Sequence, residues 1–98
     1  ARPSPNVATS GASLFERHGC GACHRIDGTP AQGNVGPDLS HVGARRTLAA
    51  GILPNTDEAM ARFITEPQKI KPGQHMPGFD MLPAGDIDAI AAYLRSLQ

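Results

Sequence analysis

The strongest hydrophobic pattern of the sequence lies at its C-terminal end. Apolar residues recur there at helical spacing, at Ile87, Ile90, Ala91, Leu94 and Leu97. Residues at this spacing share one face of a helix, so the pattern predicts a helix over residues 84–97 with that face in the core. The start of this helix lacks a favourable cap, because Pro83 and Gly85 stand where Ser, Asp or Glu would be better.

The N-terminal end combines a proline-rich stretch with a weaker helical pattern. Residues 1–9 consist mainly of Pro and small polar residues, which predicts a linker or an extended arm ahead of one domain over residues 10–98. Ser10 is a suitable N-cap for a helix that reaches about His18 and turns Phe15 inward. We therefore expect the first helix to start at Ser10.

The middle of the chain contains the pattern of one more helix, between the two at the ends. Thr56 can cap it, and the acidic residues that follow Thr56 suit the positive end of a helix dipole. The helix would cover residues 57–66 and end at Pro67, which cannot continue a helix.

Long loops are predicted on both sides of this middle helix. Residues 25–47 and 67–83 are rich in Gly, Pro, Asn and Asp, and residues 47–51 are expected to form at most a short turn of helix. No strand-like alternation is visible, so the predicted class is all-α, with three main helices and two long loops. Loops of this length in a small domain normally have to wrap around something.

One short motif indicates what the loops enclose. Cys20, Cys23 and His24 form the pattern C-x-x-C-H, which is typical of covalent haem c attachment. Each thiol can form a thioether to a porphyrin vinyl group, and the histidine can ligate the iron. A disulfide between these cysteines would close a very short loop, a zinc site would need four ligands, and a thioredoxin-like pair would need a βαβ pattern. These three alternatives are weaker interpretations of the same residues.

Composition and charge narrow the function further. The chain has 98 residues with no Trp, one Tyr and three Phe, so its core is thin and a bound haem would supply apolar surface. Positive and negative side chains balance at nine each, which argues against nucleic-acid binding. No apolar run approaches the roughly 20 residues of a membrane span. Both cysteines belong to the motif, so none is left for a disulfide.

The second axial ligand of the iron has several candidates. Met76 lies in a loop bracketed by Pro and Gly, and Met–His ligation gives a high-potential iron suited to one-electron transfer. His75 is the main rival, and Met81 can also reach the ring from the same loop. Met60 lies on a predicted helix face, which favours a role in core packing. The two remaining histidines, His18 and His41, are expected at the surface or at the haem rim.

Several motifs together resemble class I cytochrome c over residues 10–98. They are the C-x-x-C-H motif, Gly36-Pro37-Asp38-Leu39, Met76-Pro77 and Ala91-Ala92-Tyr93-Leu94. The resemblance implies the class I cytochrome c fold around one covalent haem, held through Cys20 and Cys23, with His24 and Met76 as iron ligands. It also implies that the Pro37 carbonyl accepts a hydrogen bond from the His24 ring and that Leu39 packs on the haem. It implies that Gly11 and Phe15 meet the last helix at Ile90, Tyr93 and Leu94.

A narrower resemblance is to the cytochrome c domain fused to subunit II of caa3-type terminal oxidases. The segments 41–56 and 67–77 are similar to that group. By this resemblance Arg45 or Arg46 would approach a haem propionate, for which a guanidinium is well suited. The copper domain of such a subunit is absent from this sequence. Because the chain begins with Ala1 rather than Met, we expect an excised domain or a processed, free-standing relative.

The function implied by the resemblance is one-electron transfer rather than enzymatic catalysis. The expected partners are an upstream electron donor and the copper centre of a terminal oxidase, at the periplasmic or outer face of the cytoplasmic membrane. The domain itself is expected to be a monomer. The alternatives are a free-standing periplasmic carrier and, more remotely, a haem peroxidase or gas-ligand sensor with an open sixth position on the iron.

Overall fold

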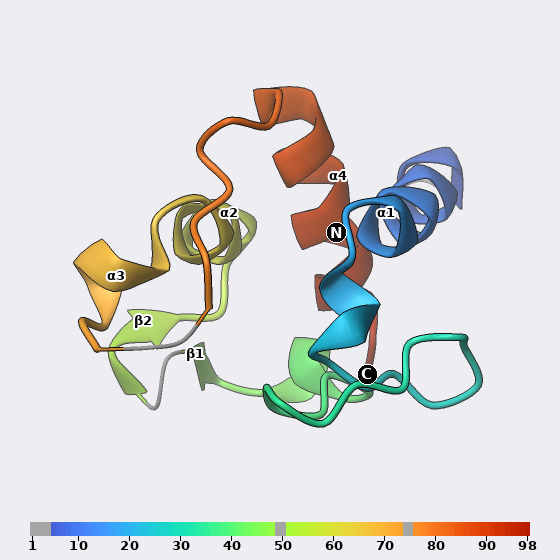
Figure 1. The fold of residues 1–98 in the computed structure, drawn as a ribbon, viewed down its shortest axis with the longest axis horizontal. Helices are drawn as coiled ribbons and strands as arrows, with labels where there is room; N and C mark the ends of the chain where they lie inside the picture. Colours follow the sequence, from blue (N-terminus) through green and yellow to red (C-terminus); the bar gives the residue numbers. More distant parts are fainter. Residues whose placement is uncertain (1–4, 49–50, 74–75) are drawn as a thin grey trace.

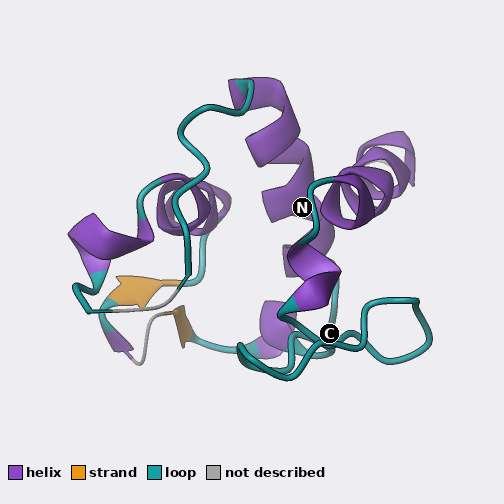
Figure 2. Ribbon diagram, viewed as in Figure 1, coloured by secondary structure: helices purple, strands orange, loops and turns teal. Residues whose placement is uncertain are grey.

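Helices make up most of the regular structure (Figure 1; Figure 2), in agreement with the predicted all-α class. The computed structural model describes residues 5–48, 51–73 and 76–98. These residues contain four α-helices, two short 3-10 helices and one pair of short strands, in the order α1 (Pro5–Arg17), η1 (Cys20–Ala22), η2 (Val42–Ala44), β1 (Thr47–Leu48), β2 (Leu53–Pro54), α2 (Asp57–Thr65), α3 (Pro67–Ile70) and α4 (Ala84–Arg95).

Helix α1 starts earlier than the sequence predicts. It begins at Pro5, so the expected start at Ser10 is wrong. Proline is well tolerated in the first turn of a helix, where its missing N–H would have no partner within the helix. The division of the chain into an arm over residues 1–9 and a domain over residues 10–98 stays a prediction.

Helices α2 and α4 begin where the sequence predicts. The Thr56 side chain caps α2 by accepting a hydrogen bond from the Ala59 amide at 3.1 Å. This bond satisfies one of the amide groups that the first turn leaves without a partner. Pro83 precedes α4 and supplies no side-chain cap, and α4 ends at Arg95, two residues before the predicted end.

The segment after α2 contains a helix that was not predicted. α2 ends at Thr65, and Pro67 opens the four-residue helix α3 instead of starting a continuous loop. The proline ring fixes φ near its helical value, so the same residue that ends one helix can begin the next.

A small hairpin replaces the predicted turn of helix over residues 47–51. Strands β1 and β2 pair antiparallel, with Thr47 opposite Pro54 and Leu48 opposite Leu53. The helical interpretation is therefore wrong for Thr47 and Leu48. Residues 49–50 belong to the same prediction and lie outside the described residues.

The crossing of α1 and α4 joins the two ends of the chain (Figure 1), as the family resemblance implied. A Cβ added to Gly11 would lie 2.1 Å from the Ala89 carbonyl oxygen and 2.5 Å from Cβ of Tyr93. Only a residue without a side chain therefore permits this close approach. One helical turn further on, Phe15 is 2% exposed, and its ring centroid lies 6.0 Å from that of Tyr93 in an edge-to-face arrangement.

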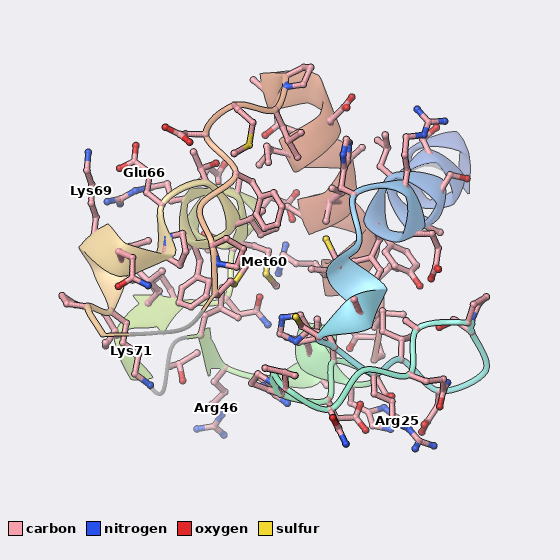
Figure 3. All side chains as sticks on the ribbon, viewed as in Figure 1. Arg25, Arg46, Met60, Glu66, Lys69 and Lys71 are labelled. Carbon is pink, nitrogen blue, oxygen red and sulfur yellow. The ribbon has the colours of Figure 1, made fainter. Side chains whose placement is uncertain are left out.

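The core continues from this crossing to α2, which packs on the other side of α4. Met60 is 5% exposed in this core, as the sequence predicted, and is labelled near the middle of the molecule in Figure 3. The buried side chains of the described residues are all apolar. They come mainly from α1, α2 and α4, so these helices form a scaffold that carries the loops.

In the described part of the chain, no helix has both the length and the apolar character needed to cross a membrane.

Candidate functional site

The C-x-x-C-H segment forms the turn that follows α1. Gly19 takes a left-handed φ of 78° before η1, a conformation that glycine adopts without strain. The amide groups of Cys23 and His24 both donate to the Cys20 carbonyl, at 3.2 and 3.0 Å. One tight turn therefore carries both thiols and the imidazole ring.

Both cysteines are free thiols and are half-buried. Burial raises the pKa of the Cys20 thiol, a backbone hydrogen bond partly opposes this shift, and the charges of Cys23 and Glu16 raise the pKa further. At neutral pH the Cys20 side chain is therefore an uncharged thiol. Two free thiols on one turn are the groups that covalent attachment of a porphyrin requires.

The His24 ring is held by the loop that faces it. Its Nδ1 lies 2.8 Å from the Pro37 carbonyl oxygen, which is the contact implied by the family resemblance. A carbonyl only accepts, so Nδ1 carries the proton and donates, and Nε2 keeps a free lone pair. A Cβ added to Gly36 would lie 2.4 Å from Cε1 of the His24 ring, so a glycine at this position lets the loop lie against the imidazole.

Backbone hydrogen bonds fasten this loop to the motif. The Gly36 amide donates to the Cys23 carbonyl at 2.7 Å, and the Leu39 amide donates to the Arg25 carbonyl at 2.8 Å. These two bonds bracket Pro37 on both sides. Leu39 is half-buried against the apolar core, and its packing on a haem stays a prediction.

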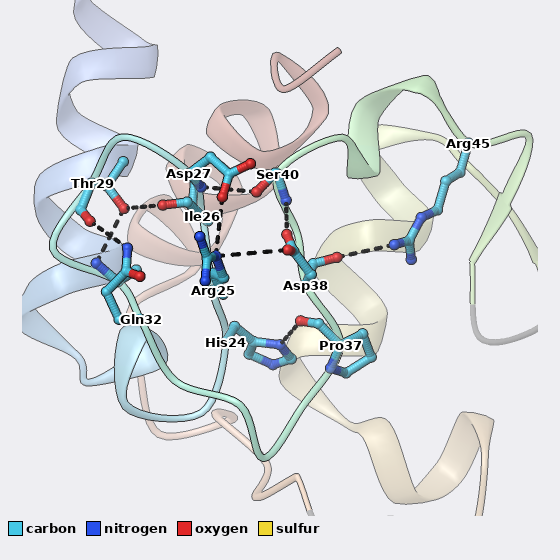
Figure 4. A network of polar contacts seen from close by, with 11 residues as sticks. His24, Arg25, Ile26, Asp27, Thr29, Gln32, Pro37, Asp38, Ser40 and Arg45 are labelled. Atoms are coloured by element: carbon cyan, nitrogen blue, oxygen red, sulfur yellow. Dashed lines mark hydrogen bonds and ion pairs between the residues drawn. The ribbon is translucent and has the colours of Figure 1, made fainter.

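A polar network covers the outer side of the same loop (Figure 4). The Asp27 amide donates to Ser40 Oγ at 2.8 Å, and the Ser40 amide donates to Asp38 Oδ1 at 2.8 Å. Arg25 Nε donates to Asp27 Oδ1 at 3.0 Å and lies 4.0 Å from Asp38 Oδ2. Arg45 Nη2 donates to the Asp38 carbonyl at 3.0 Å. Exposed ion pairs contribute little stability, but the bonds to backbone groups restrict the path of the loop.

Asn55 holds in place the segment that carries Arg45 and Arg46, the two residues that could pair with a haem propionate. Its side-chain amide donates to the carbonyls of Val42 and Arg45, at 2.9 and 2.7 Å, and its backbone amide donates to the Arg46 carbonyl at 3.1 Å. Its side-chain oxygen accepts from Nε of Arg95 at 3.3 Å. The Arg46 side chain is exposed and points outward at the edge of the molecule (Figure 3), whereas Arg45 turns toward Asp38. Contact of either arginine with a propionate stays a prediction.

Sequence reasoning did not single out Asn55 or the network around Asp38. Asn55 lies between Pro54 and Thr56, where it looks like an ordinary turn residue. The spacing of Asp38 and Ser40 carried a weak signal, because an Asp side chain often accepts from the amide two residues further on.

The methionines occupy different environments. Met76 is half-buried at the start of the segment 76–83, and its carbonyl lies 3.5 Å from Nε2 of Gln68. Met81 is 71% exposed, and Met60 is buried in the core. His75, the rival candidate for the sixth ligand position, lies outside the described residues.

The other two histidines have protein partners. His18 Nε2 lies 3.3 Å from Asp86 Oδ2 and so links the end of α1 to the start of α4. His41 Nδ1 lies 2.9 Å from the carbonyl oxygen of Gln98. His41 is exposed, as expected for a surface residue, and His18 is half-buried. A place at the haem rim stays a prediction for both.

A hollow of about 580 Å³ lies elsewhere, between α2, α3 and the start of α4. None of the predicted site residues lines it. Its walls carry charges of both signs, with Arg62 and Lys69 near Asp80 and Asp88. The hollow therefore does not mark the chemistry of the C-x-x-C-H segment.

The residues of this site fit a covalently held haem. Two free thiols and an imidazole with an available Nε2 lie on one turn, and Gly36 leaves the imidazole ring unobstructed by a side chain. Within the described ranges, no three His, Cys, Asp or Glu side chains gather into a metal-binding cluster. The two thiols and the His24 imidazole are the groups that would hold a porphyrin-bound iron.

A helical scaffold that presents this motif defines a c-type haem protein. The sequence matches the Cytochrome c family over residues 8–98, and the chain belongs to that family. The family carries haem c through covalent bonds, and the two cysteines of this chain are consistent with such a site. The chain is accordingly an electron-transfer domain.

Curated relatives and a solved structure agree with this assignment. The chain is 36% identical over 96 residues to cytochrome c oxidase subunit 2 of Alkalihalophilus pseudofirmus, covering 98% of this chain and 27% of that protein. It is also 36% identical over 95 residues to the same subunit of Bacillus sp. strain PS3, covering 94% of this chain and 26% of the relative. The chain thus spans about a quarter of the length of these relatives.

The structural comparison supports the fold. The c-type cytochrome SorU from Sinorhizobium meliloti superposes with a TM-score of 0.67 over 96% of this chain and 93% of that one, at 24% identity. The predicted cytochrome c fold is therefore confirmed.

Proposed function

We propose that this chain binds one haem c through Cys20 and Cys23 and transfers single electrons to the copper centre of a terminal oxidase, as the haem domain of an oxidase subunit 2. The observation that carries the haem assignment is the His24 ring, whose Nδ1 donates to the Pro37 carbonyl at 2.8 Å and leaves Nε2 available for iron. The similarity to cytochrome c oxidase subunit 2 in two bacilli supports the choice of acceptor.

The side chains of the C-x-x-C-H motif would hold and orient the haem. Cys20 and Cys23 would each hold the haem through a thioether bond, the product of adding the thiol S–H across one porphyrin vinyl group. When bound, the haem supplies an iron that alternates between ferrous and ferric states. The Pro37 carbonyl keeps the His24 proton on Nδ1, which fixes the ring orientation and raises the basicity of Nε2.

Met76 would supply its thioether sulfur as a second protein ligand of the iron. Pro77 follows Met76 directly in the sequence. A thioether ligand favours the ferrous state of the iron and so gives a high redox potential. Leu39 would contact the macrocycle, and Arg45 or Arg46 would pair with a propionate, since guanidinium groups match carboxylates in geometry and charge.

The proposed partners follow from the relatives. An upstream donor would reduce the haem, and the copper centre of the oxidase would accept the electron at the periplasmic or outer face of the cytoplasmic membrane. The formal charge of the chain is zero, so electrostatic steering toward either partner should be weak.

Absorption spectra of the oxidised and reduced protein test the haem assignment and its ligands together. We expect sharp reduced haem c bands and a weak far-red methionine–iron band in the oxidised wild type. Met76→Ala should lose the far-red band, and Met81→Ala should keep it, because Met81 is 71% exposed. A far-red band that survives in Met76→Ala would refute this ligand. Rapid cyanide binding by the wild type at neutral pH would favour the peroxidase or sensor alternative.

Reoxidation of the reduced protein tests the acceptor. A terminal oxidase whose own haem c domain has been deleted should regain oxygen consumption when the wild type is added with a reductant. The rate should change little with ionic strength, because the chain has no net charge. If the haem-loaded protein fails to restore turnover, the acceptor is a different one and the free-standing carrier becomes the better interpretation.

A further inference from the structure

We propose that Asp38 is a positioning residue that holds the Pro37 carbonyl against Nδ1 of His24. Its carboxylate and its backbone carbonyl are fixed from opposite sides of the chain, by Ser40 and by Arg45. The inference rests on the proposed ligation of iron by His24, and it adds a residue that controls this ligand without touching it.

The group that needs positioning is the peptide unit between Pro37 and Asp38. A peptide unit is planar, so the direction of the Pro37 carbonyl depends on ψ of Pro37 and φ of Asp38. The pyrrolidine ring already fixes φ of Pro37. On the other side, Gly36 lies so close to the His24 ring that the chain before the proline has little freedom to shift. The remaining freedom lies at Asp38.

Two contacts remove that freedom. The Asp38 Oδ1 atom accepts from the Ser40 amide at 2.8 Å, which closes a turn over Leu39. The Asp38 carbonyl accepts from Arg45 Nη2 at 3.0 Å. Side chain and main chain of Asp38 are thus both anchored. With Gly36 held against the His24 ring, the peptide that carries the Pro37 carbonyl has both ends restrained, so its rotation would displace one of these bonded groups.

The turn is also anchored to the segment that follows His24. Ser40 Oγ accepts from the Asp27 amide at 2.8 Å, and the Leu39 amide donates to the Arg25 carbonyl at 2.8 Å. Arg25 Nε bridges toward both acids, at 3.0 Å from Asp27 Oδ1 and 4.0 Å from Asp38 Oδ2 (Figure 4). The histidine and its acceptor therefore share one bonded frame instead of lying on independent loops.

The expected consequence concerns the electronics of the ligand. A firmly held acceptor makes the imidazole a more basic ligand, which favours the ferric state. Releasing the carbonyl should therefore raise the midpoint potential and expose the Nδ1 proton to solvent exchange. The negative charge of the Asp38 carboxylate also favours the ferric state, so the loss of this charge would raise the midpoint potential as well. The experiment therefore has to separate the effect of position from the effect of charge.

Three variants of the haem-loaded protein separate position from charge. Asp38→Asn removes the charge but keeps a side-chain oxygen for the Ser40 amide, whereas Asp38→Ala removes both. Asp88→Ala removes one charge from the exposed face of α4 and serves as the matched control. We expect the midpoint potential to rise more in Asp38→Ala than in Asp38→Asn, and to stay near the wild-type value in Asp88→Ala.

Exchange of the His24 Nδ1 proton, followed by NMR in the reduced protein, gives a readout independent of charge. It should be about fivefold faster in Asp38→Ala than in Asp38→Asn, the factor expected from one lost hydrogen bond of typical strength. Ser40→Ala should change both readouts in the same direction by less, and it provides the test if Asp38→Ala does not fold.

Two results would overturn the proposal. Equal potential shifts in Asp38→Ala and Asp38→Asn, with unchanged exchange, would mean that only the charge matters. Unchanged potential and exchange in both variants would mean that the Pro37 carbonyl is held without Asp38. A wild type without haem c bands would instead refute the proposed function, and exchange of the Nδ1 proton in the haem-free chain would still test the positioning role.

Discussion

The crossing of α1 with α4 and the loop around His24 are held together by different forces. At the crossing, Gly11 allows backbone contact and Phe15 fills the interface at 2% exposure. The loop over residues 25–45 also buries a few apolar side chains, but many of its contacts are hydrogen bonds between exposed side chains and backbone groups (Figure 4). The crossing relies on packing, whereas the loop depends in addition on polar contacts of particular residues.

This difference affects what each region contributes. Apolar packing supplies most of the folding free energy, because the burial of carbon surface is the dominant favourable term. The polar contacts are individually weak in water, but they have directions, and the orientation of the His24 ring depends on direction. We therefore expect substitutions at the crossing to change stability and substitutions in the loop to change mainly the ligand geometry.

The largest expected effect is that of Phe15→Ala at the crossing. Removing a buried aromatic ring leaves a cavity and typically costs about 3–5 kcal/mol of unfolding free energy. Denaturant unfolding followed by far-UV circular dichroism measures the change. Val35→Ala is the control, because Val35 is 75% exposed and its truncation should leave stability nearly unchanged. A Phe15→Ala loss as small as that of the control would mean that the crossing is not the main apolar core.

Gly11→Ala tests the close approach of the two helices. The added methyl group would meet the Ala89 carbonyl at 2.1 Å, so the helices must separate at a cost of about 2 kcal/mol, typical of overpacking. Helix propensity alone would favour the alanine by about 1 kcal/mol. Gly85→Ala in α4 is the matched control, since nothing lies within 4 Å of its added Cβ, and it should be neutral or slightly stabilising. Equal stability changes at the two glycines would contradict the close crossing.

Asn55→Ala tests the polar contacts that hold the loop. It leaves the carbonyls of Val42 and Arg45 without their side-chain donor, which should cost about 1–3 kcal/mol. The same denaturant titration measures the loss, and Asn34→Ala in an exposed loop should show almost none. We further expect the midpoint potential of haem-loaded Asn55→Ala to change, since the segment with Arg45 and Arg46 is released. A stability loss with an unchanged potential would separate Asn55 from the haem environment.

The smallest expected effect is the pH dependence due to Asp38. Hydrogen bonds from the Ser40 side chain and backbone lower the pKa of this carboxyl below 3.8. A lowered folded pKa means that the contribution to stability is present above the unfolded value and is lost as the pH falls through the folded one. Wild type and Asp38→Asn should therefore converge in denaturant midpoint below pH 3.8. Curves that stay parallel across that range would show that the Asp38 carboxylate contributes nothing to stability.

The sequence predicted the helical scaffold better than the loops. The apolar stripe of α4 and the Thr56 cap of α2 appeared in the structure as expected, because short-range spacing determines both. The start of α1 at Pro5 and the pairing of Thr47 with Pro54 were missed. The start of α1 follows from the tolerance of the first helical turn for proline, whereas the pairing of Thr47 with Pro54 depends on a contact between two segments that outweighs weak local preferences.

For the site, the C-x-x-C-H motif identified both thiols and the imidazole from spacing alone, and the family resemblance supplied the Pro37 contact. The residues that fix this contact were not predicted. Asp38 and Asn55 look like ordinary turn residues in the sequence, and their partners lie at positions as distant as Arg95. Such pairings have no periodic signal.

By itself, the sequence determined the chemistry of the site and the class of the fold, because covalent attachment needs particular side chains at fixed spacing and helices need apolar residues at helical intervals. Only the tertiary structure decided which nitrogen of the His24 ring carries the proton, since that depends on the Pro37 carbonyl 13 residues away. It also decided how closely α1 and α4 approach at Gly11. Both are distances between segments that are far apart along the chain, and such distances are fixed only when the whole chain has folded.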